Sequence, residues 1–266
     1  MKKIDTLLFT DLDGTLLTHS KRISDNNISA INRLREHGGD VTVATGRSVE
    51  SARRYVNKAC VNLPVIVYNG VMIYDYQSEK ILWNDMLTSK AAEYVRIIKE
   101  NFPNVGIEVL RNDKIYVVVT NRHVKEHIET EMLEYVMCEL SKTPKDWFKV
   151  LMALDEEDIP ALAEFIDKQN FEDVYCVQTS RNYFEMLPKG SSKGNAMKIL
   201  CGILNKDIKN TAAIGDYNND LEMIECANTG AAMENAPDSV KSVADIVCPD
   251  CERDGFAYFV DYILNK

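Results

Sequence analysis

The chain has 266 residues, 45% of them hydrophobic, which is enough for one large or two medium-sized domains. The net charge of −10 argues against a nucleic-acid polymer as partner, because neutralising phosphates requires clustered Lys and Arg. No apolar run approaches the ~20 residues of a membrane span, and Asp5 and Asp11 shorten the N-terminal run below that of a secretion signal. Seven cysteines then favour reduced thiols, so we expect a cytoplasmic protein without a membrane partner.

Two carboxylates follow the first predicted strand. The apolar run 6–10 predicts a buried strand, and Asp11-Leu12-Asp13-Gly14-Thr15 comes directly after it. Side chains at i and i+2 of an extended segment point the same way, so Asp11 and Asp13 can face one reacting atom. Gly14 allows the backbone to turn sharply. The pair alone is a weak signal, since Asp is also common in turns.

A second polar strand end follows. A helix over 28–34, ended by Gly38-Gly39, precedes a predicted strand at 41–44 and a helix through Tyr55. Thr45, Gly46 and Arg47 end that strand, and Ser48 is placed to cap the helix. A hydroxyl and backbone N–H groups at a strand tip form a natural phosphate cradle. A further strand at 65–68 completes a strand–helix–strand–helix–strand order.

The segment from Asn84 to Leu187 has a different pattern and is long enough for its own domain. A hairpin of 71–74 and 81–83 leads into it. We predict helices around 94–98, through 128–140 and through 162–166, and strands at 107–110, 115–119, 149–154, 175–178 and 183–187. His123 and His127 lack a third ligand and a nearby Glu base, so we interpret them as surface histidines rather than a metal site.

The last third supplies a cation and a metal-binding strand end. Ser191-Ser192-Lys193 predicts a helix start, from which Lys193 can reach an anion. The strand 211–214 leads into Gly215–Asp220, whose acidic groups suit an oxygen-liking divalent ion. A short helix from 221, a strand at 230–233 and a C-terminal helix over 256–264 follow. Both halves should join in one doubly wound sheet with these motifs at the carboxyl ends of its strands.

Cys248-Pro249-Asp250-Cys251 has the spacing of thiol–disulfide oxidoreductases and of half a zinc site. It follows a strand and lies in a loop before the last helix, whereas the redox motif opens a helix. A second Cys pair that would complete a zinc site is missing from the sequence. The sequence therefore favours a structural interpretation of this motif over a redox or metal site, and leaves open whether the two cysteines have a role of their own.

Taken together, these segments resemble the haloacid dehalogenase (HAD) superfamily of phosphohydrolases, whose signatures are Asp-x-Asp-Gly-Thr, a strand-end Thr or Ser, a lysine and Gly-Asp-x-x-x-Asp. Thr45-Gly46-Arg47, Tyr68-Asn69-Gly70, Lys193-Gly194-x-Ala196 and Asn219-Asp220 are similar to the Cof-type subfamily. The resemblance spans nearly the whole chain. It implies an α/β fold: a doubly wound, mostly parallel Rossmann-like core of residues 1–83 and 188–266, with an inserted α/β cap over 84–187 that sets substrate specificity.

The expected chemistry is phosphate ester hydrolysis with Mg²⁺. A carboxylate approaching a phosphate dianion meets repulsion of ~4 kcal/mol per unit-charge pair at ~4 Å and an effective dielectric near ~20. Mg²⁺ held by Asp11 and Asp216, with Lys193 on another side, offsets that repulsion. The resemblance adds the backbone carbonyl of Asp13 to the metal ligands.

The resemblance, together with this charge balance, implies a role for each residue. Asp11 attacks phosphorus to form an aspartyl-phosphate, while Asp13 protonates the leaving alkoxide and later deprotonates the hydrolytic water. The residues expected to bind the substrate phosphate are Thr45, Gly46, Arg47 and Asn219. Asp220 is placed behind them by the resemblance, where it orients Lys193 or the metal's waters.

The substrate is expected to be a small phosphorylated metabolite, such as a sugar phosphate, a nucleotide or a cofactor phosphate, and the protein a monomer or homodimer. Polar residues beside the predicted cap strands are conceivable contacts of the leaving group: Arg111, Lys114, Arg181 and Asn182. One alternative is a phosphomutase or phosphotransferase that uses the same intermediate. Another is a non-catalytic phosphometabolite-binding regulator, against which the intact Asp11 argues, because a binder gains nothing from a nucleophile.

Overall fold

The structure, a computed structural model, describes residues 3–111 and 114–266 and divides into two compact units. The first unit comprises Met1–Gly46, Ala52–Trp83 and Ser192–Lys266. The second comprises Arg47–Ser51 and Asn84–Ser191. Throughout the described ranges, no helix has both the length and the apolar character that crossing a bilayer requires.

A five-stranded parallel sheet forms the centre of the first unit, in the order β14-β13-β12-β1-β2. Its strands are short and almost wholly buried, as expected for a parallel sheet covered on both faces. The strands are β1 (Leu7–Thr10), β2 (Asp40–Val43), β12 (Thr211–Gly215), β13 (Thr229–Met233) and β14 (Ile246–Cys248). The expected α/β class with a parallel central sheet is therefore confirmed.

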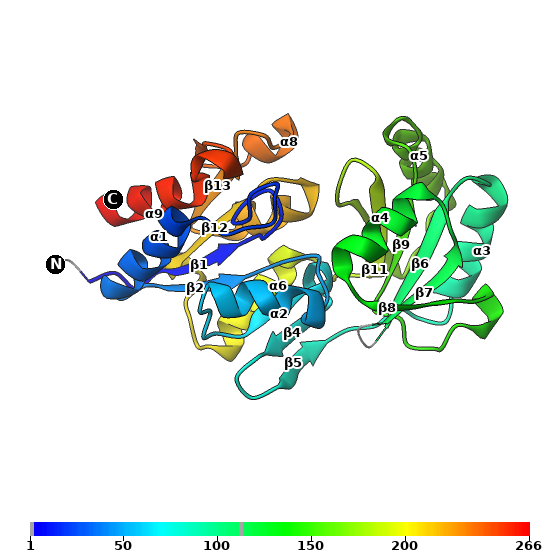
Figure 1. Ribbon diagram of the computed structural model, residues 1–266, viewed down its shortest axis with the longest axis horizontal. Coiled ribbons are helices and arrows are strands. Elements are labelled where there is room, and N and C mark those ends of the chain that lie inside the picture. The colour runs from blue at the N-terminus through cyan, green and yellow to red at the C-terminus, as the bar shows by residue number, and fades with distance from the viewer. Residues whose placement is uncertain (1–2, 112–113) are drawn as a thin grey trace. The chain divides into compact units, whose positions relative to one another are not determined.

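Helices pack on this sheet through the alternation of its side chains. Leu7 and Phe9 of β1 contact apolar residues of α6 and α7, so Leu8 between them points to the opposite face. Helices α1 and α9 lie side by side, joined where the backbone N–H of Ala257 donates to Asn27 Oδ1 at 3.1 Å (Figure 1). The helices of this unit are α1 (Asp25–Glu36), α2 (Val49–Lys58, whose first turn belongs to the second unit), α6 (Lys193–Ile203), α7 (Leu221–Cys226), α8 (Asp238–Lys241) and α9 (Gly255–Asn265).

The strand predicted at 65–68 does not continue the main sheet. β3 (Val65–Val67) belongs to a separate three-stranded sheet with β4 (Met72–Asp75) and β5 (Lys80–Asn84), which Figure 1 shows below the main sheet. A single parallel bridge between Ala44 and Ile66 connects β3 to the end of β2. The chain reverses direction at η1 (Tyr68–Gly70), and β4, the first strand of the predicted hairpin, then pairs antiparallel with β3. This pairing makes β3 part of the hairpin's sheet.

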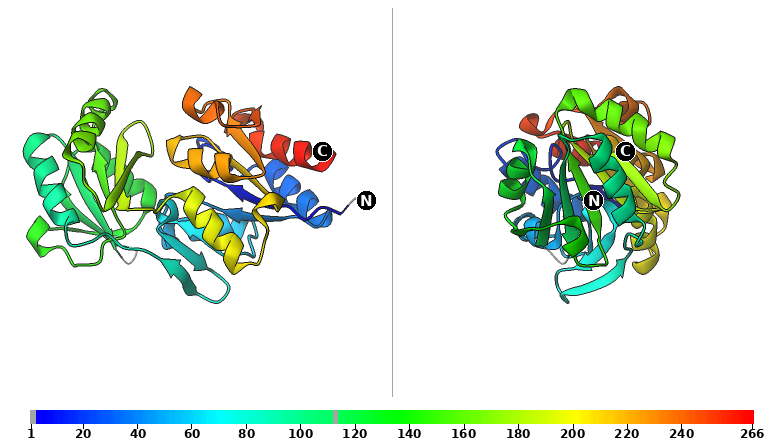
Figure 2. Two further views of the ribbon diagram at one scale, coloured as in Figure 1. Left: turned by 180° about the vertical axis from the view of Figure 1, so that it is seen from behind. Right: turned by 90° about the vertical axis from the view of Figure 1, so that its right-hand side faces the viewer.

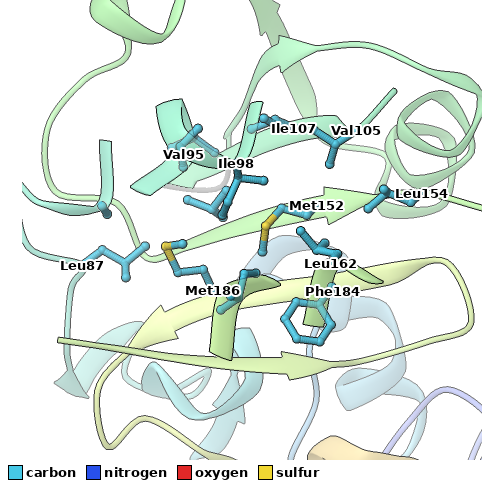
Figure 3. Packing of buried hydrophobic residues seen from close by; sticks show 14 of the residues in the cluster. Leu87, Val95, Ile98, Val105, Ile107, Met152, Leu154, Leu162, Phe184 and Met186 are labelled. Carbon is cyan, nitrogen blue, oxygen red and sulfur yellow. The ribbon is translucent and has the colours of Figure 1, made fainter. Parts of the chain in front are cut away.

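The second unit is built on a six-stranded sheet in the order β10-β11-β9-β6-β7-β8, antiparallel except for the β7–β8 pair. Helices α3 and α5 cover one face with an apolar core, in which Ile98, Met152 and Leu162 point toward one another (Figure 3). Figure 2 shows the same helices from behind. The elements are β6 (Gly106–Arg111), β7 (Lys114–Val119), β8 (Glu134–Met137), β9 (Lys149–Ala153), β10 (Val174–Gln178), β11 (Tyr183–Pro188), α3 (Ala91–Asn101), α4 (Arg122–Glu131) and α5 (Ile159–Gln169).

The helix predicted through residue 140 is wrong beyond residue 131. Helix α4 ends at Glu131, and Met132 has the left-handed φ of +55° that terminates it. The chain then forms edge strand β8, which pairs in parallel with β7. Tyr135 and Val136 are strand-favouring residues, but their pairing with β7 is a tertiary interaction that the local sequence does not show.

The interpretation of His123 and His127 as surface residues is also wrong, because both are buried. His123 Nε2 lies 2.7 Å from Asp155 Oδ1, and His127 Nδ1 lies 2.6 Å from Oε2 of the fully buried Glu108. Burial alone would lower the pKa of His127, but Glu108 outweighs burial and raises it. The two histidines are held by carboxylates of the second unit.

Candidate active site

The predicted motifs stand at the carboxyl ends of neighbouring parallel strands. Asp11 follows β1, Asp216 follows β12, and Thr45 comes two residues after β2. β1 lies between the other two strands, so the sheet order itself brings these ends to one edge. Lys193 begins α6, where Ser192 caps the helix by accepting a hydrogen bond from Asn195 N at 3.0 Å.

The Lys193 ammonium connects two carboxylates. Its Nζ donates to Asp11 Oδ1 at 2.7 Å and to Asp220 Oδ1 at 2.6 Å, and all three side chains are buried. Ion pairs taken out of water are favourable only when both partners are well hydrogen-bonded. Here the ammonium has a partner on each side, which fixes the position of the Asp11 carboxylate.

Asp216 completes a cluster of carboxylates. Asp11, Asp216 and Asp220 each offer an oxygen, and these oxygens lie within 4.8 Å of one another. Asp216 also accepts hydrogen bonds from Thr15 Oγ1 and from Asn235 Nδ2, each at 3.2 Å. Sequence reasoning did not assign Thr15 or Asn235 to the site, although Thr15 closes the Asp-x-Asp-Gly-Thr motif.

The charges of this cluster shift its pKa values. Burial raises the pKa of Asp11 to about 7, with Asp220 and Asp13 adding to the shift and Lys193 opposing it. Burial and the neighbouring Asp11 and Asp220 raise the pKa of Asp216 well above its usual range. Burial would lower the pKa of Lys193, but Asp11 and Asp220 outweigh burial and raise it. The lysine is therefore a permanent cation, whereas a further positive charge nearby would favour the ionised forms of Asp11 and Asp216.

The donor set fits a hard divalent cation. Three carboxylates gather around one ammonium, and burial, followed by the neighbouring carboxylates, raises the pKa of Asp11 and of Asp216. Oxygen ligands are those that Mg²⁺ prefers. Both carboxylate oxygens of Asp220 already accept hydrogen bonds. Oδ1 accepts from Lys193, and Oδ2 accepts from the backbone N–H groups of Asp216 and Tyr217. Asp11 and Asp216 are thus the carboxylates best placed to hold the ion.

Asp13 lies in the turn after Asp11 and remains accessible. Its side chain is 34% exposed, and Oδ1 accepts from Lys21 Nζ at 2.6 Å. Sequence reasoning missed Lys21, because nothing in its neighbourhood marks it as a partner of Asp13. Gly14 has φ +82°, and a Cβ on it would lie 2.3 Å from Asp216 Oδ2, so only glycine permits this close approach.

Asn69 joins the two polar segments around Thr45 and Asn219. The backbone N–H of Asn69 donates to Thr45 O at 3.0 Å, and its side-chain Oδ1 accepts from Asn219 Nδ2 at 2.9 Å. A Cβ on Gly46 would lie 2.9 Å from the Asn69 amide, which explains the glycine at this position. Asn69 adopts a left-handed φ of +57°, which asparagine tolerates better than most residues, and the motif Tyr68-Asn69-Gly70 was the available sequence signal for it.

Arg47 is buried and lies beside a carboxylate of the second unit. It belongs to the second unit, where its Nη1 lies 3.6 Å from Glu131 Oε1. Glu131 Oε2 also accepts from Ser51 Oγ at 2.6 Å. Ser48 caps α2 as predicted, by accepting from Ser51 N at 3.1 Å.

Cys248 and Cys251 are free and buried. Burial raises the pKa of Cys248 to about 12, and burial, followed by Glu252 and Asp216, raises that of Cys251 to about 11. Both are protonated thiols at neutral pH, which is the opposite of what a redox-active cysteine requires.

Comparison with known proteins places this arrangement in a family. A family model described as haloacid dehalogenase-like hydrolase matches residues 8–260. The 5-amino-6-(5-phospho-D-ribitylamino)uracil phosphatase YitU of Bacillus subtilis (strain 168) is 28% identical over 262 residues, covering 96% of each chain. The pyridoxal phosphate phosphatase YbhA of Escherichia coli (strain K12) is 29% identical over 260 residues, covering 94% of this chain and 95% of its own.

A solved structure agrees with the sequence comparison. TM0651 from Thermotoga maritima superimposes with a TM-score of 0.79 at 27% identity and covers 98% of this chain and 97% of its own. The expected resemblance is thereby confirmed, as is the expectation of an enzyme that hydrolyses phosphate monoesters. The chain belongs to the haloacid dehalogenase-like hydrolases.

Proposed function

We propose that this enzyme is a Mg²⁺-dependent phosphatase that hydrolyses a small phosphorylated metabolite through an aspartyl-phosphate on Asp11. The observation that carries the proposal is the buried ammonium of Lys193, which donates to Asp11 within a cluster of three carboxylates. The carboxylates of this cluster can bind a cation, and that cation and the lysine can together bind an anionic phosphate. Two relatives named as phosphatases of a ribitylaminouracil phosphate and of pyridoxal phosphate support the substrate class.

Asp11 is the proposed nucleophile. Its carboxylate is buried, is oriented by Lys193, and follows directly from a strand of the rigid sheet. Bound Mg²⁺ would supply the positive charge that keeps Asp11 ionised and offsets the charge of the phosphoryl oxygens. Lys193 opposes the rise that burial causes in the pKa of Asp11, and it stays charged itself.

Asp13 is the proposed general acid and base. Its side chain is the more exposed of the two motif carboxylates, so it can exchange a proton with a leaving group and with water. It protonates the leaving alkoxide while Asp11 bonds to phosphorus. It then takes a proton from the water that attacks the aspartyl-phosphate, which releases inorganic phosphate and restores Asp11.

The remaining predicted residues take supporting roles in the proposal. Thr45, Gly46 and Asn219 would bind phosphoryl oxygens, and Asn69 holds this group together. Asn219 Nδ2 carries two hydrogens, of which one is donated to Asn69 Oδ1, so the other could be donated to a phosphoryl oxygen. Asp220 would position Lys193 through their hydrogen bond, and Arg47 would be a further ligand of the substrate.

We further propose that residues 1–83 and 188–266 act as the catalytic core and that residues 84–187 act as the cap that selects the leaving group. The support is that the aspartate cluster, Lys193, Thr45 and Asn219 all belong to the first unit. The second unit has its own sheet and its own apolar core, as an inserted domain requires.

The test is phosphate release from p-nitrophenyl phosphate and from a panel of sugar phosphates, nucleotides and cofactor phosphates. We expect release with MgCl₂ and none after chelation with EDTA. The Asp11→Asn variant should be inactive while the control Asp40→Asn, an exposed aspartate at the start of β2, keeps full activity. Isomerised sugar phosphate without free phosphate would instead identify a mutase, and activity in Asp11→Asn would exclude Asp11 as the nucleophile.

A further inference from the structure

A second group of metal-ligating side chains lies in the first unit and shares no residue with the aspartate cluster. His19, Cys251 and Glu252 each offer one ligand atom, and these atoms all lie within 4.8 Å of one another. His19 follows the turn that contains Asp13, whereas Cys251 and Glu252 lie in the 3-10 turn η6 (Cys251–Arg253) after β14. Cys251 is buried, and His19 and Glu252 are exposed, so the group opens to solvent on one side.

The two segments that carry this group are fastened to each other. The backbone N–H of His19 donates to Glu252 Oε1 at 2.6 Å. Further along the first segment, Ser24 Oγ and Asn26 Nδ2 donate to the two oxygens of Asp254, each at 2.6 Å. The ligand atoms are therefore held near one another by the protein, which reduces the ordering entropy that a bound ion has to offset.

The spacing of the three ligand atoms is compatible with a tetrahedral zinc site. Metal bonds of ~2.0–2.3 Å to nitrogen, sulfur and oxygen place neighbouring ligands about 3.3 to 3.8 Å apart in a tetrahedron. The observed separations are at most 4.8 Å, and the exposed side chains of His19 and Glu252 can rotate to approach that range. A nitrogen, sulfur and oxygen donor set also separates this group from a magnesium site, because Mg²⁺ prefers oxygen ligands.

We propose that His19, Cys251 and Glu252 bind Zn²⁺, or a transition-metal cation of the same ligand preference, with a water molecule as the fourth ligand. Binding displaces the thiol proton of Cys251 to solvent and forms a metal–thiolate bond. The bound ion ties the segment that follows Asp13 to the loop after β14. It acts alongside the proposed Mg²⁺ at the aspartate cluster and does not replace it.

Titration of the full-length protein with Co²⁺, in excess Mg²⁺ and without oxygen, tests the proposal. We expect a thiolate-to-cobalt charge-transfer band in the near ultraviolet that saturates at one Co²⁺ per chain and disappears when Zn²⁺ is added. The Cys251→Ser variant should lack the band, and the control Cys248→Ser, which alters the other buried cysteine of the same motif, should keep it. Absence of the band in the unaltered protein, or its survival in Cys251→Ser, would overturn the proposal.

A second variant keeps the test decisive if Cys251→Ser does not fold. His19 is exposed, so His19→Ala should fold normally, and we expect it to weaken Zn²⁺ binding in calorimetry by at least about 100-fold. The control His37→Ala, which changes a histidine of the same unit outside the group, should bind Zn²⁺ with unchanged affinity. Equal affinities of the His19→Ala and unaltered proteins would contradict the assignment of His19.

Discussion

Lys193 donates to Asp11 and to Asp220, and it is the buried cation of the candidate site. Removing its charge leaves buried carboxylates without their partner, which costs far more than the loss of an exposed ion pair. The same charge is proposed to stabilise the phosphoryl group in the transition state. Both effects depend on one ammonium. A substitution that removes this charge should therefore change both stability and activity, whereas the same substitution at an exposed lysine of α6 should change neither.

Lys193→Met keeps the length of the side chain and removes the charge. We expect kcat/KM for p-nitrophenyl phosphate to fall by at least about 10²–10³-fold, the usual effect of removing one positioned transition-state donor. Breaking the buried pairs should also destabilise the protein by roughly 3–5 kcal/mol in denaturant unfolding. Lys198→Met, an exposed lysine on the same helix, is the control and should change neither quantity appreciably. A kcat/KM for Lys193→Met close to that of this control would refute the proposed role.

At the scale of an element, the turn after β1 depends on glycine for two separable reasons. Gly14 has φ +82°, and a Cβ there would also collide with Asp216. Gly190 has a nearly identical φ of +84°, but nothing lies within 4 Å of its Cβ position. The two glycines therefore distinguish the cost of a left-handed backbone from the cost of displacing Asp216.

Gly14→Ala and Gly190→Ala should each lose about 1–2 kcal/mol of stability from backbone strain. Only Gly14→Ala should also lose phosphatase activity and Mg²⁺ affinity, because its Cβ pushes Asp216 away from Asp11. Denaturant unfolding measures the first effect, and steady-state kinetics over a range of Mg²⁺ concentrations measures the second. Equal Mg²⁺ dependence in both variants would mean that the close approach of Gly14 to Asp216 has no part in metal binding.

Much of this arrangement could be predicted from the sequence, because strand ends and helix starts have local signals. Asp11 follows an apolar run and Lys193 follows a capping serine, and neighbouring parallel strands bring such ends together. The edge strand β8 and the buried His127 could not be predicted. Their partners, β7 and Glu108, are reached only through tertiary pairing, for which the residues around 127–137 carry no local signal.

For the whole molecule, stability should depend on pH and on Mg²⁺ together. The pKa of Asp11 is raised from 3.8 to about 7, and that of Asp216 is also raised. Between these pH values the folded protein holds more protons than the unfolded chain, so its stability without metal falls as the pH rises through this window. Metal binding requires the ionised carboxylates, so it stabilises the protein most at the upper end of the window.

Thermal unfolding at about pH 5 and about pH 8, with and without MgCl₂, measures this coupling. At Mg²⁺ concentrations near 100 times its Kd, the ion should add about 2.7 kcal/mol at the higher pH and much less at the lower pH. The Asp216→Asn variant should lose most of this pH-dependent gain, and the exposed Asp40→Asn should retain it. A Mg²⁺ effect of equal size at both pH values would show that Asp11 and Asp216 do not bind the ion as carboxylates.

The proposed covalent intermediate is tested most directly by trapping it. Enzyme mixed with p-nitrophenyl phosphate and MgCl₂, quenched with acid during turnover and digested, is analysed by peptide mass spectrometry. We predict one added phosphoryl group on the peptide that contains Asp11, located on Asp11 itself and absent from the Asp11→Asn protein. A phosphoryl group on another residue, or hydrolysis that proceeds with an unmodified Asp11 peptide at every quench time, would contradict the account.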